Sequence, residues 1–248
     1  MNYRAVIAFD GTDFQGWQLQ EEGKPTIQGA ITAALNTLAG MKVTVHGAGR
    51  TDSGVHARGQ VASFRLPAVW EPLKLRAAVN ANLPAAIRVL EIAQAPDDFH
   101  ARVYARGKTY RYQLDTGAVA DPLLARYSWH QPSGTPRLID LELLLGTGGL
   151  LLGTHDFTVF TVAACETKTR TRTLTDFRIE ARENMVALYF CGNGFLRYQV
   201  RRMVSALLAL NKRGWKPATF TELISMCEEA RATQLAPARG LTLMKVEY

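Results

Sequence analysis

The 248-residue sequence has few of the side chains that staple small domains or hold metal ions. Its three cysteines, Cys165, Cys191 and Cys227, lie far apart and form no Cys-x-x-Cys pair. Its five histidines are scattered, and no His-Glu-x-x-His sequence occurs. These absences argue against a disulfide framework, a structural zinc site and a zinc-protease helix. We therefore expect no metal site in this protein.

Long apolar runs are also missing from the sequence. No stretch approaches the roughly 18–20 apolar residues that a membrane-spanning helix needs. The N-terminus reads MNYR and then alternates like a strand, without the apolar block of a signal peptide. With 47% hydrophobic and 21% charged residues, the chain has the composition of a folded globular protein. We expect a cytoplasmic protein.

Positive charge is in excess and unevenly distributed. Lysine and arginine number 29 against 22 acidic residues, which gives a net charge of +7. Residues 1–124 carry 13 basic and 11 acidic side chains, whereas residues 165–216 carry 11 and 4. A local surplus of this size is typical of a surface that binds a polyanion. A basic surface without a partner would give the same count, so charge alone leaves both interpretations open.

Periodicity predicts two successive α+β units. In residues 1–103, strands are expected at 3–9, 43–46, 60–65 and 87–95, with helices at 26–40 and from 72 onward. This order of strands and helices is that of a ferredoxin-like unit. In residues 104–248, strands are expected at 108–115, 174–182, 185–191 and 241–248, and helices at 138–152, 195–212 and 219–230. The predicted fold class is α+β, with mainly antiparallel sheets flanked by helices.

The densest group of reactive side chains lies between the second and third predicted strands, where residues 47–57 read GAGRTDSGVHA. Its glycines permit tight turns and close approach of the backbone to a ligand. On such a loop Asp52 could act as a nucleophile, a base or a charge partner. Alternatively, Asp52 only bonds nearby backbone amides, as most loop aspartates do.

An aspartic peptidase is one mechanistic alternative. The tripeptides at Asp52 and at Asp115 read DSG and DTG, and paired carboxylates on such loops share a proton in those enzymes. That fold is almost entirely β, whereas several helices are predicted here. The basic residues of 165–216 also have no obvious use in a peptidase.

The segment 49–57, GRTDSGVHA, closely resembles the signature of the tRNA pseudouridine synthase A family. Five further motifs resemble the same family in the same order along nearly the whole chain. They are FDGT and FQGWQ at 9–18, FHAR at 99–102, KTYRY at 108–112, NGFL followed by Val200 and Arg201, and ARGL at 238–241. A chance match of six ordered motifs is very improbable.

The resemblance implies a function, a fold and a site. The expected activity is isomerisation of uridine to pseudouridine at positions 38 to 40 of the tRNA anticodon arm, without a cofactor. The expected architecture is the pseudouridine synthase fold, with the active-site cleft between the two units, in a homodimer that binds tRNA. Asp52 matches the essential nucleophile and Arg201 its cationic partner. The positions that match substrate-contacting residues are Tyr110, Leu241 and Arg50.

Flipping a stacked uridine into a pocket is costly, and phosphate contacts by basic side chains would offset that cost. As a set, the candidates for these contacts are Arg58, Lys168, Arg170, Arg172, Arg197 and Arg202. Each one taken singly is more often a solvated surface charge. The principal alternative function is a non-catalytic RNA-binding protein of the same fold, with the peptidase a distant third.

Overall fold

The computed structural model describes residues 1–21, 23–132, 139–162, 167–229 and 235–248, and within them the chain divides into two compact units. Unit 1 consists of Met1–Arg106 and Thr242–Tyr248, and unit 2 of Gly107–Leu241. Residues 242–248, expected in the second unit, belong to unit 1. The reason is that strand β10 (Leu241–Glu247) pairs in parallel with β3, where Thr242 lies opposite His56.

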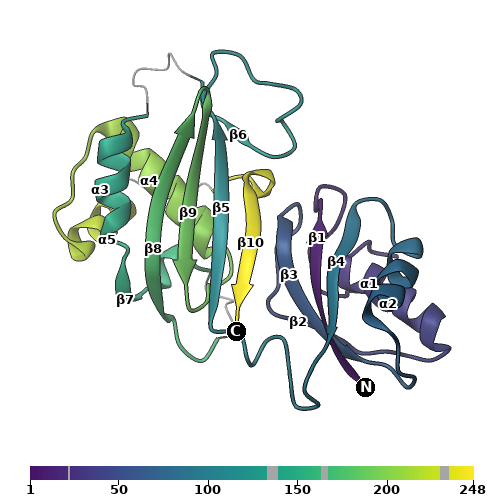
Figure 1. The fold of residues 1–248 in the computed structure, drawn as a ribbon. Helices are drawn as coiled ribbons and strands as arrows, with labels where there is room; N and C mark the ends of the chain where they lie inside the picture. Colours follow the sequence, from purple (N-terminus) through teal and green to yellow (C-terminus); the bar gives the residue numbers. More distant parts are fainter. Residues whose placement is uncertain (22, 133–138, 163–166, 230–234) are drawn as a thin grey trace. The chain divides into compact units, whose positions relative to one another are not determined.

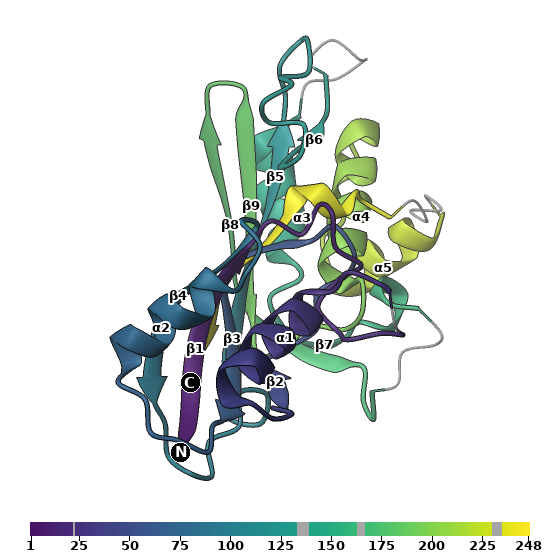
Figure 2. The same ribbon diagram turned by 90° about the vertical axis from the view of Figure 1, so that its right-hand side faces the viewer.

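Unit 1 has the strand order of the predicted ferredoxin-like unit. Its elements are β1 (Asn2–Phe9), α1 (Ile27–Ala39), β2 (Val45–Gly47), β3 (His56–Arg65), α2 (Pro72–Ala81) and β4 (Ile87–Gln94). Strand β1 lies between β4 and β3, antiparallel to both. The other edge of β3 is shared, because β2 pairs with its residues 62–64 and β10 with residues 56–57. Both helices lie on one face of this sheet (Figure 1, Figure 2).

Helix α1 begins and ends where its sequence predicts. The Thr26 hydroxyl accepts a hydrogen bond from a backbone amide of the first turn, and Gly40 ends the helix with a φ of 64°. Ile27, Ile31 and Leu35 are buried, as their spacing of four residues requires for one helix face. The observed bounds, Ile27–Ala39, agree with the helix predicted at 26–40.

In unit 2, antiparallel strands of the sheet have helices packed on one face (Figure 1, Figure 2). Its strands are β5 (Gly107–Asp115), β6 (Trp129–His130), β7 (Gly153–Asp156), β8 (Thr171–Arg182) and β9 (Met185–Gly192). Its helices are α3 (Leu141–Gly149), α4 (Gln199–Arg213) and α5 (Phe220–Glu229). The strands follow the order β5-β9-β8-β7, all antiparallel, and β6 adds to β5 in parallel.

Helix α4 begins four residues later than the predicted start at residue 195. Tyr198, directly before the helix, has a φ of 65°, a left-handed conformation that only a non-helical residue can take. The predicted first residue of α3, Leu138, and the predicted last residue of α5, Ala230, lie outside the described part of the chain. None of the described helices is long and apolar enough to span a bilayer.

The two units together confirm the predicted fold class. The described residues form mixed α and β structure with a mostly antiparallel sheet, in which β6 joins β5 and β10 joins β3 in parallel. Strand β3 begins at His56, earlier than the predicted start at residue 60, because its first residues pair with β10.

Candidate active site

Asp52 lies in the loop between β2 and β3, in unit 1, and its side chain is half-buried. The backbone turns directly after it: the Val55 amide donates to the Asp52 carbonyl at 3.2 Å, and Gly54 has a φ of 76°. A left-handed backbone conformation at this position strongly favours glycine. The loop therefore presents a carboxylate at the rim of the folded core, on a fixed turn.

A second loop, residues 10–18, holds the Asp52 loop from the side. The Trp17 amide donates to the Thr51 carbonyl at 3.1 Å, and the Gly54 amide donates to the Phe14 carbonyl at 3.3 Å. The Ser53 hydroxyl donates to the same Phe14 carbonyl at 3.1 Å. The residues before and after Asp52 are thus bonded to one neighbouring segment. The opening motif of the sequence and the GRTDSGVHA segment form one structural unit.

Glycines make this close approach possible. A Cβ atom at Gly11 would lie 2.0 Å from the Val55 carbonyl oxygen, and one at Gly16 would lie 2.6 Å from the Thr51 carbonyl oxygen. Gly16 also has a φ of 86°. Both contacts are with backbone atoms, which cannot move aside without shifting the loop. The two glycines of the opening motif are therefore required by the loop that carries Asp52.

The base of the Asp52 loop is anchored to β3 and to a buried indole. The Ala48 amide donates to the Val61 carbonyl at 2.7 Å, and the Gln60 side chain donates to the Gly49 carbonyl at 2.9 Å. A Cβ at Gly47 would lie 2.5 Å from the ring of Trp17. Directly before Thr51, Arg50 points outward and is exposed.

Tyr110 lies on β5 of unit 2, and only 8% of its surface is exposed. Its ring meets Phe195 edge to face, with centroids 5.2 Å apart and planes at 85°. Tyr112 lies two residues further on the same face and is fully buried. Burial raises the pKa of the Tyr112 phenol, an effect that the nearby charges of Arg201 and Arg239 oppose. The two tyrosines therefore share one buried face of β5.

Arg201 lies in the first turn of α4, and only 9% of its surface is exposed. Its Nε donates to the Ala236 carbonyl at 2.7 Å, and its guanidinium carbon lies 5.5 Å from the centre of the Tyr198 ring. Arg197 lies over the same ring at 4.9 Å. Arg201 is therefore not an ordinary solvated charge on the helix surface.

The segment before β10 is tied to the same region of unit 2. The Tyr112 hydroxyl donates to the Pro237 carbonyl at 2.8 Å, and Arg239 Nε donates to the Ser128 carbonyl at 3.2 Å. A Cβ at Gly240 would lie 2.6 Å from the Tyr112 ring, so only glycine fits there. These contacts fix the position at which β10 starts. Leu241, the first residue of that strand, is 5% exposed.

The six basic residues predicted as an RNA-binding set differ in exposure. Arg58, Lys168 and Arg197 are exposed, whereas Arg170, Arg172 and Arg202 are half-buried. Arg172 lies beside the turn that leads to α4, because a Cβ at Gly194 would be 3.9 Å from its Nε. The Arg202 Nε is buried and has no hydrogen-bond partner among the residues that the structure describes.

Asp115, the second aspartate of the peptidase alternative, has a structural role. It is 3% exposed, and its two carboxylate oxygens accept hydrogen bonds from the amides of Gly117 at 2.9 Å and Asp121 at 3.1 Å. Its carboxylate therefore orders the loop after β5. Together with five helices in the described residues, this engagement argues against an aspartic peptidase.

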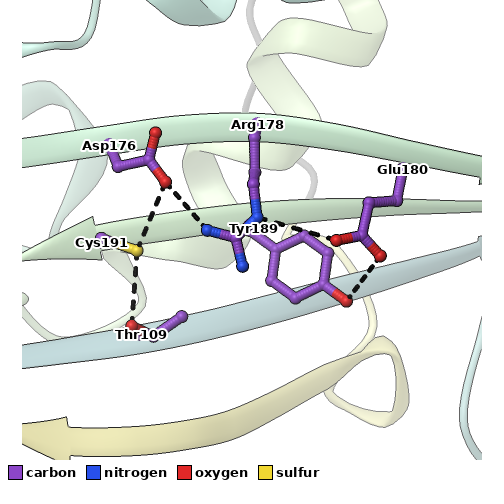
Figure 3. A network of polar contacts seen from close by, with 6 residues as sticks. All are labelled: Thr109, Asp176, Arg178, Glu180, Tyr189 and Cys191. Atoms are coloured by element: carbon purple, nitrogen blue, oxygen red, sulfur yellow. Dashed lines mark hydrogen bonds and ion pairs between the residues drawn. The ribbon is translucent and has the colours of Figure 1, made fainter.

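A polar cluster on the other face of the unit 2 sheet contains no catalytic arrangement among its described side chains (Figure 3). Arg178 is bonded to Asp176 at 3.0 Å, contacts Glu180 at 3.7 Å and lies 4.4 Å from the centre of the Tyr189 ring. The cation is thus shared between two carboxylates of its own strand. Cys191, at the end of the cluster, lies 3.3 Å from the Thr109 hydroxyl.

The thiols and acidic groups give no sign of a metal centre in the described part of the chain. Burial raises the pKa of the Cys227 thiol to about 12, which leaves it protonated and unreactive. Cys165 lies outside the described residues. Across the described ranges, no group of three or more histidine, cysteine, aspartate or glutamate side chains is placed to hold a metal ion.

The residues that support the Asp52 loop were not found from the sequence. Trp17, Gln18 and Gln60 bond to residues of this loop that are 11 to 34 positions away in the sequence, and no local periodicity marks such contacts. The left-handed conformation of Tyr198 was likewise not predicted, because non-glycine residues rarely adopt it. The glycines at 11 and 16 were the available signal, since each permits close approach of backbone.

An α+β chain with a carboxylate on a clamped loop and an excess of basic residues has features that fit an enzyme acting on nucleic acid. Comparison with known proteins specifies the family. A sequence model described as tRNA pseudouridine synthase matches residues 5–103 and 149–248. The chain is 39% identical to tRNA pseudouridine synthase A 1 of Desulfotalea psychrophila, over 100% of this chain and 99% of that protein. It is 37% identical to the tRNA pseudouridine synthase A proteins of Moorella thermoacetica and Latilactobacillus sakei, over 99% of this chain and 98% of each protein. The chain belongs to the tRNA pseudouridine synthase family.

Proposed function

We propose that this protein isomerises uridine to pseudouridine at positions 38, 39 and 40 of the tRNA anticodon arm. The observation that carries the proposal is full-length similarity to proteins named tRNA pseudouridine synthase A, at 33–39% identity. In the reaction the N1–C1′ bond of the nucleoside breaks and a C5–C1′ bond forms. C5 loses a proton and N1 gains one, so the composition of the nucleoside is unchanged. The reaction is redox-neutral, and the proposed mechanism uses no cofactor.

In this proposal Asp52 is the nucleophile. The chemistry needs an ionised carboxylate that adds to an electrophilic carbon and later leaves. A carboxylate held on a fixed loop meets the requirement for orientation, and the clamp formed by residues 10–18 supports it. Arg201 is the proposed cationic partner, because a guanidinium favours the charged form of a nearby carboxylate.

Tyr110 and Leu241 are the proposed residues that contact the target base. An aromatic ring can stack on a uracil, and the Tyr110 hydroxyl is a candidate for handling the C5 proton. Leu241 would supply an apolar wall. Both side chains are largely buried in unit 2, which supports roles inside a pocket for the base rather than on an open surface.

Binding of tRNA is assigned to basic side chains as a set. The proposed set is Arg58, Lys168, Arg170, Arg172, Arg197 and Arg202, and Arg50 is separately assigned to contact with the RNA substrate. Their contacts with phosphate would offset the cost of unstacking the uridine. A-form RNA is read largely by shape, which suits an enzyme that modifies three neighbouring positions. We further propose that the protein acts in the cytoplasm as a homodimer, as its resemblance to the family implies.

The direct test is an assay with tRNA labelled with tritium at C5 of uridine. The protein should release tritium from a tRNA with uridines at positions 38–40 and should release none when cytidines replace them. Pseudouridine should appear at the same positions when the RNA is sequenced chemically. Tight binding of the tRNA without release of tritium would instead identify a non-catalytic RNA-binding protein.

A further inference from the structure

Arg50 is connected to the backbone of unit 1 through two glutamine side chains. Arg50 Nε donates to Gln18 Oε1 at 3.0 Å, and Gln18 Nε2 donates to Gln28 Oε1 at 2.8 Å. Gln28 lies in the first turn of α1, and its Nε2 donates to the Val45 carbonyl of β2 at 2.9 Å. An exposed side chain is thereby tied to a helix and a strand.

The direction of these hydrogen bonds is fixed by backbone groups. Gln28 Oε1 also accepts from the Leu19 amide at 2.7 Å, so the atom facing that N–H must be oxygen. The opposite atom faces the Val45 carbonyl and must therefore be the nitrogen. Gln18 must then direct its nitrogen to Gln28 and its oxygen to Arg50. The two linked side-chain amides therefore present to Arg50 the oxygen of Gln18, which can only accept a hydrogen bond.

The geometry points to a positioning role. We propose that Gln18 and Gln28 hold the Arg50 guanidinium by its Nε so that its two terminal nitrogens face a phosphate of the bound tRNA. The inference rests on the proposed function, in which Arg50 contacts RNA. A guanidinium presents its donors in a planar fork that matches the oxygens of a phosphate, and Nε is the donor that can be held without blocking that fork. Holding it in advance lowers the entropy lost on binding.

A double-mutant cycle between Gln18 and Arg50 tests this role. Methionine at either position keeps an unbranched chain of similar length without the polar group. Gln18→Met should weaken tRNA binding about 3–10-fold, as expected when one long side chain loses its preorganisation. Arg50→Met should weaken it more. In the Arg50→Met background, Gln18→Met should have no further effect, because the group that it positions is gone.

Arg58 provides a matched control, since it is an exposed arginine of the same unit. No hydrogen bond among the described residues joins it to Gln18 or Gln28. In an Arg58→Met background, Gln18→Met should weaken tRNA binding by the same factor as it does in the wild type. Equal effects of Gln18→Met in the wild-type and Arg50→Met backgrounds would overturn the inference. So would an Arg50→Met variant with unchanged tRNA affinity; in that case tritium release by the wild-type protein would still support the proposed function.

An NMR relaxation measurement can test, in the absence of tRNA, whether the Arg50 guanidinium is held in place. The ¹⁵N relaxation of the Arg50 Nε–H in the free protein should report an ordered bond in the wild type. It should report a mobile one in Gln18→Met and in Gln28→Met. The Arg58 Nε–H should be unchanged in both variants. An Arg50 Nε–H that is equally ordered in all three proteins would contradict the role of the two glutamines.

Discussion

At the scale of single residues, the position of Asp52 depends on two glycines that have no side chain and so allow the backbone to approach closely. Gly11 and Gly16 leave room for backbone carbonyls of the Asp52 loop that any other residue would displace. Neither glycine carries chemistry, yet both determine where the carboxylate lies. Polar contacts of Trp17, Phe14 and Ser53 then hold the loop in that position.

Gly11→Ala is therefore expected to affect both stability and catalysis. The added Cβ would lie 2.0 Å from the Val55 carbonyl oxygen, so the Asp52 loop must shift. We expect the free energy of unfolding to fall by about 1–3 kcal/mol, as for an overpacked site. Pseudouridine formation should fall at least tenfold in protein that is still folded, because small displacements of reacting groups are costly. Urea unfolding and tritium release measure the two effects. Wild-type values for both would refute the role of this contact.

The candidate reactive residues stand out in the sequence, whereas the residues that hold them in place do not. Asp52 and Arg201 were singled out by the resemblance of their segments to the tRNA pseudouridine synthase A family, since local spacing alone allows Asp52 to be an ordinary turn residue. The buried state of Arg201 and the hydrogen bonds of Gln18 and Gln28 depend on segments that meet only in the folded chain. Local patterns carry no information about such contacts.

At the scale of elements, the strongest predictions came from positions where several local signals agree. Thr26, the apolar spacing and Gly40 together define α1. Helix α4 was placed too early because the apolar residues before Gln199 continue its pattern, whereas the left-handed Tyr198 interrupts the backbone. Strands β6 and β7 were missed since they have two and four residues, too few to show alternation.

Helix α3 offers a test of packing within one element. Gly146 is exposed, and a Cβ there would have no atom within 4 Å, whereas a Cβ at Gly148 would lie 2.0 Å from the Phe177 ring. Gly146→Ala should raise the free energy of unfolding by about 0.5–1 kcal/mol through helix propensity. Gly148→Ala should lower it by about 1–3 kcal/mol through overpacking. Denaturation of the two variants in urea makes the comparison. Changes of the same sign in both would contradict the described packing of α3 on β8.

At the scale of the whole molecule, the excess charge is the property most directly related to the substrate. The chain carries a net charge of +7, and residues 165–216 hold 11 basic and 4 acidic side chains. Within that segment the charges have different surroundings. Arg178 is engaged by two carboxylates, whereas Lys168 is exposed and Arg172 lies beside the turn before α4.

Replacing Lys168, Arg170 and Arg172 together with glutamine should weaken tRNA binding and flatten its dependence on salt. Removing one cation from a phosphate should reduce the slope of log affinity against log salt by about 0.7–0.9. Turnover at saturating tRNA should be retained, because Asp52 is unchanged. Arg178→Gln, on the same strand as Arg172, is the matched control and should leave the slope as it is. If the triple variant keeps the wild-type slope, this segment does not contact the tRNA backbone.

The role of Asp52 as the nucleophile is the central claim, and turnover by Asp52→Asn tests it most directly. The amide keeps the size of the side chain but is too poor a nucleophile to replace the carboxylate. We expect pseudouridine formation to fall by at least about 1,000-fold. Affinity for tRNA should be kept, since one carboxylate facing a polyanion contributes repulsion.

Asp97→Asn makes the same change at an exposed carboxylate and should leave turnover at the wild-type rate. The melting temperature must first show that the variant is folded. A folded Asp52→Asn protein that still converts uridine at a rate near that of the wild type would remove Asp52 from the mechanism.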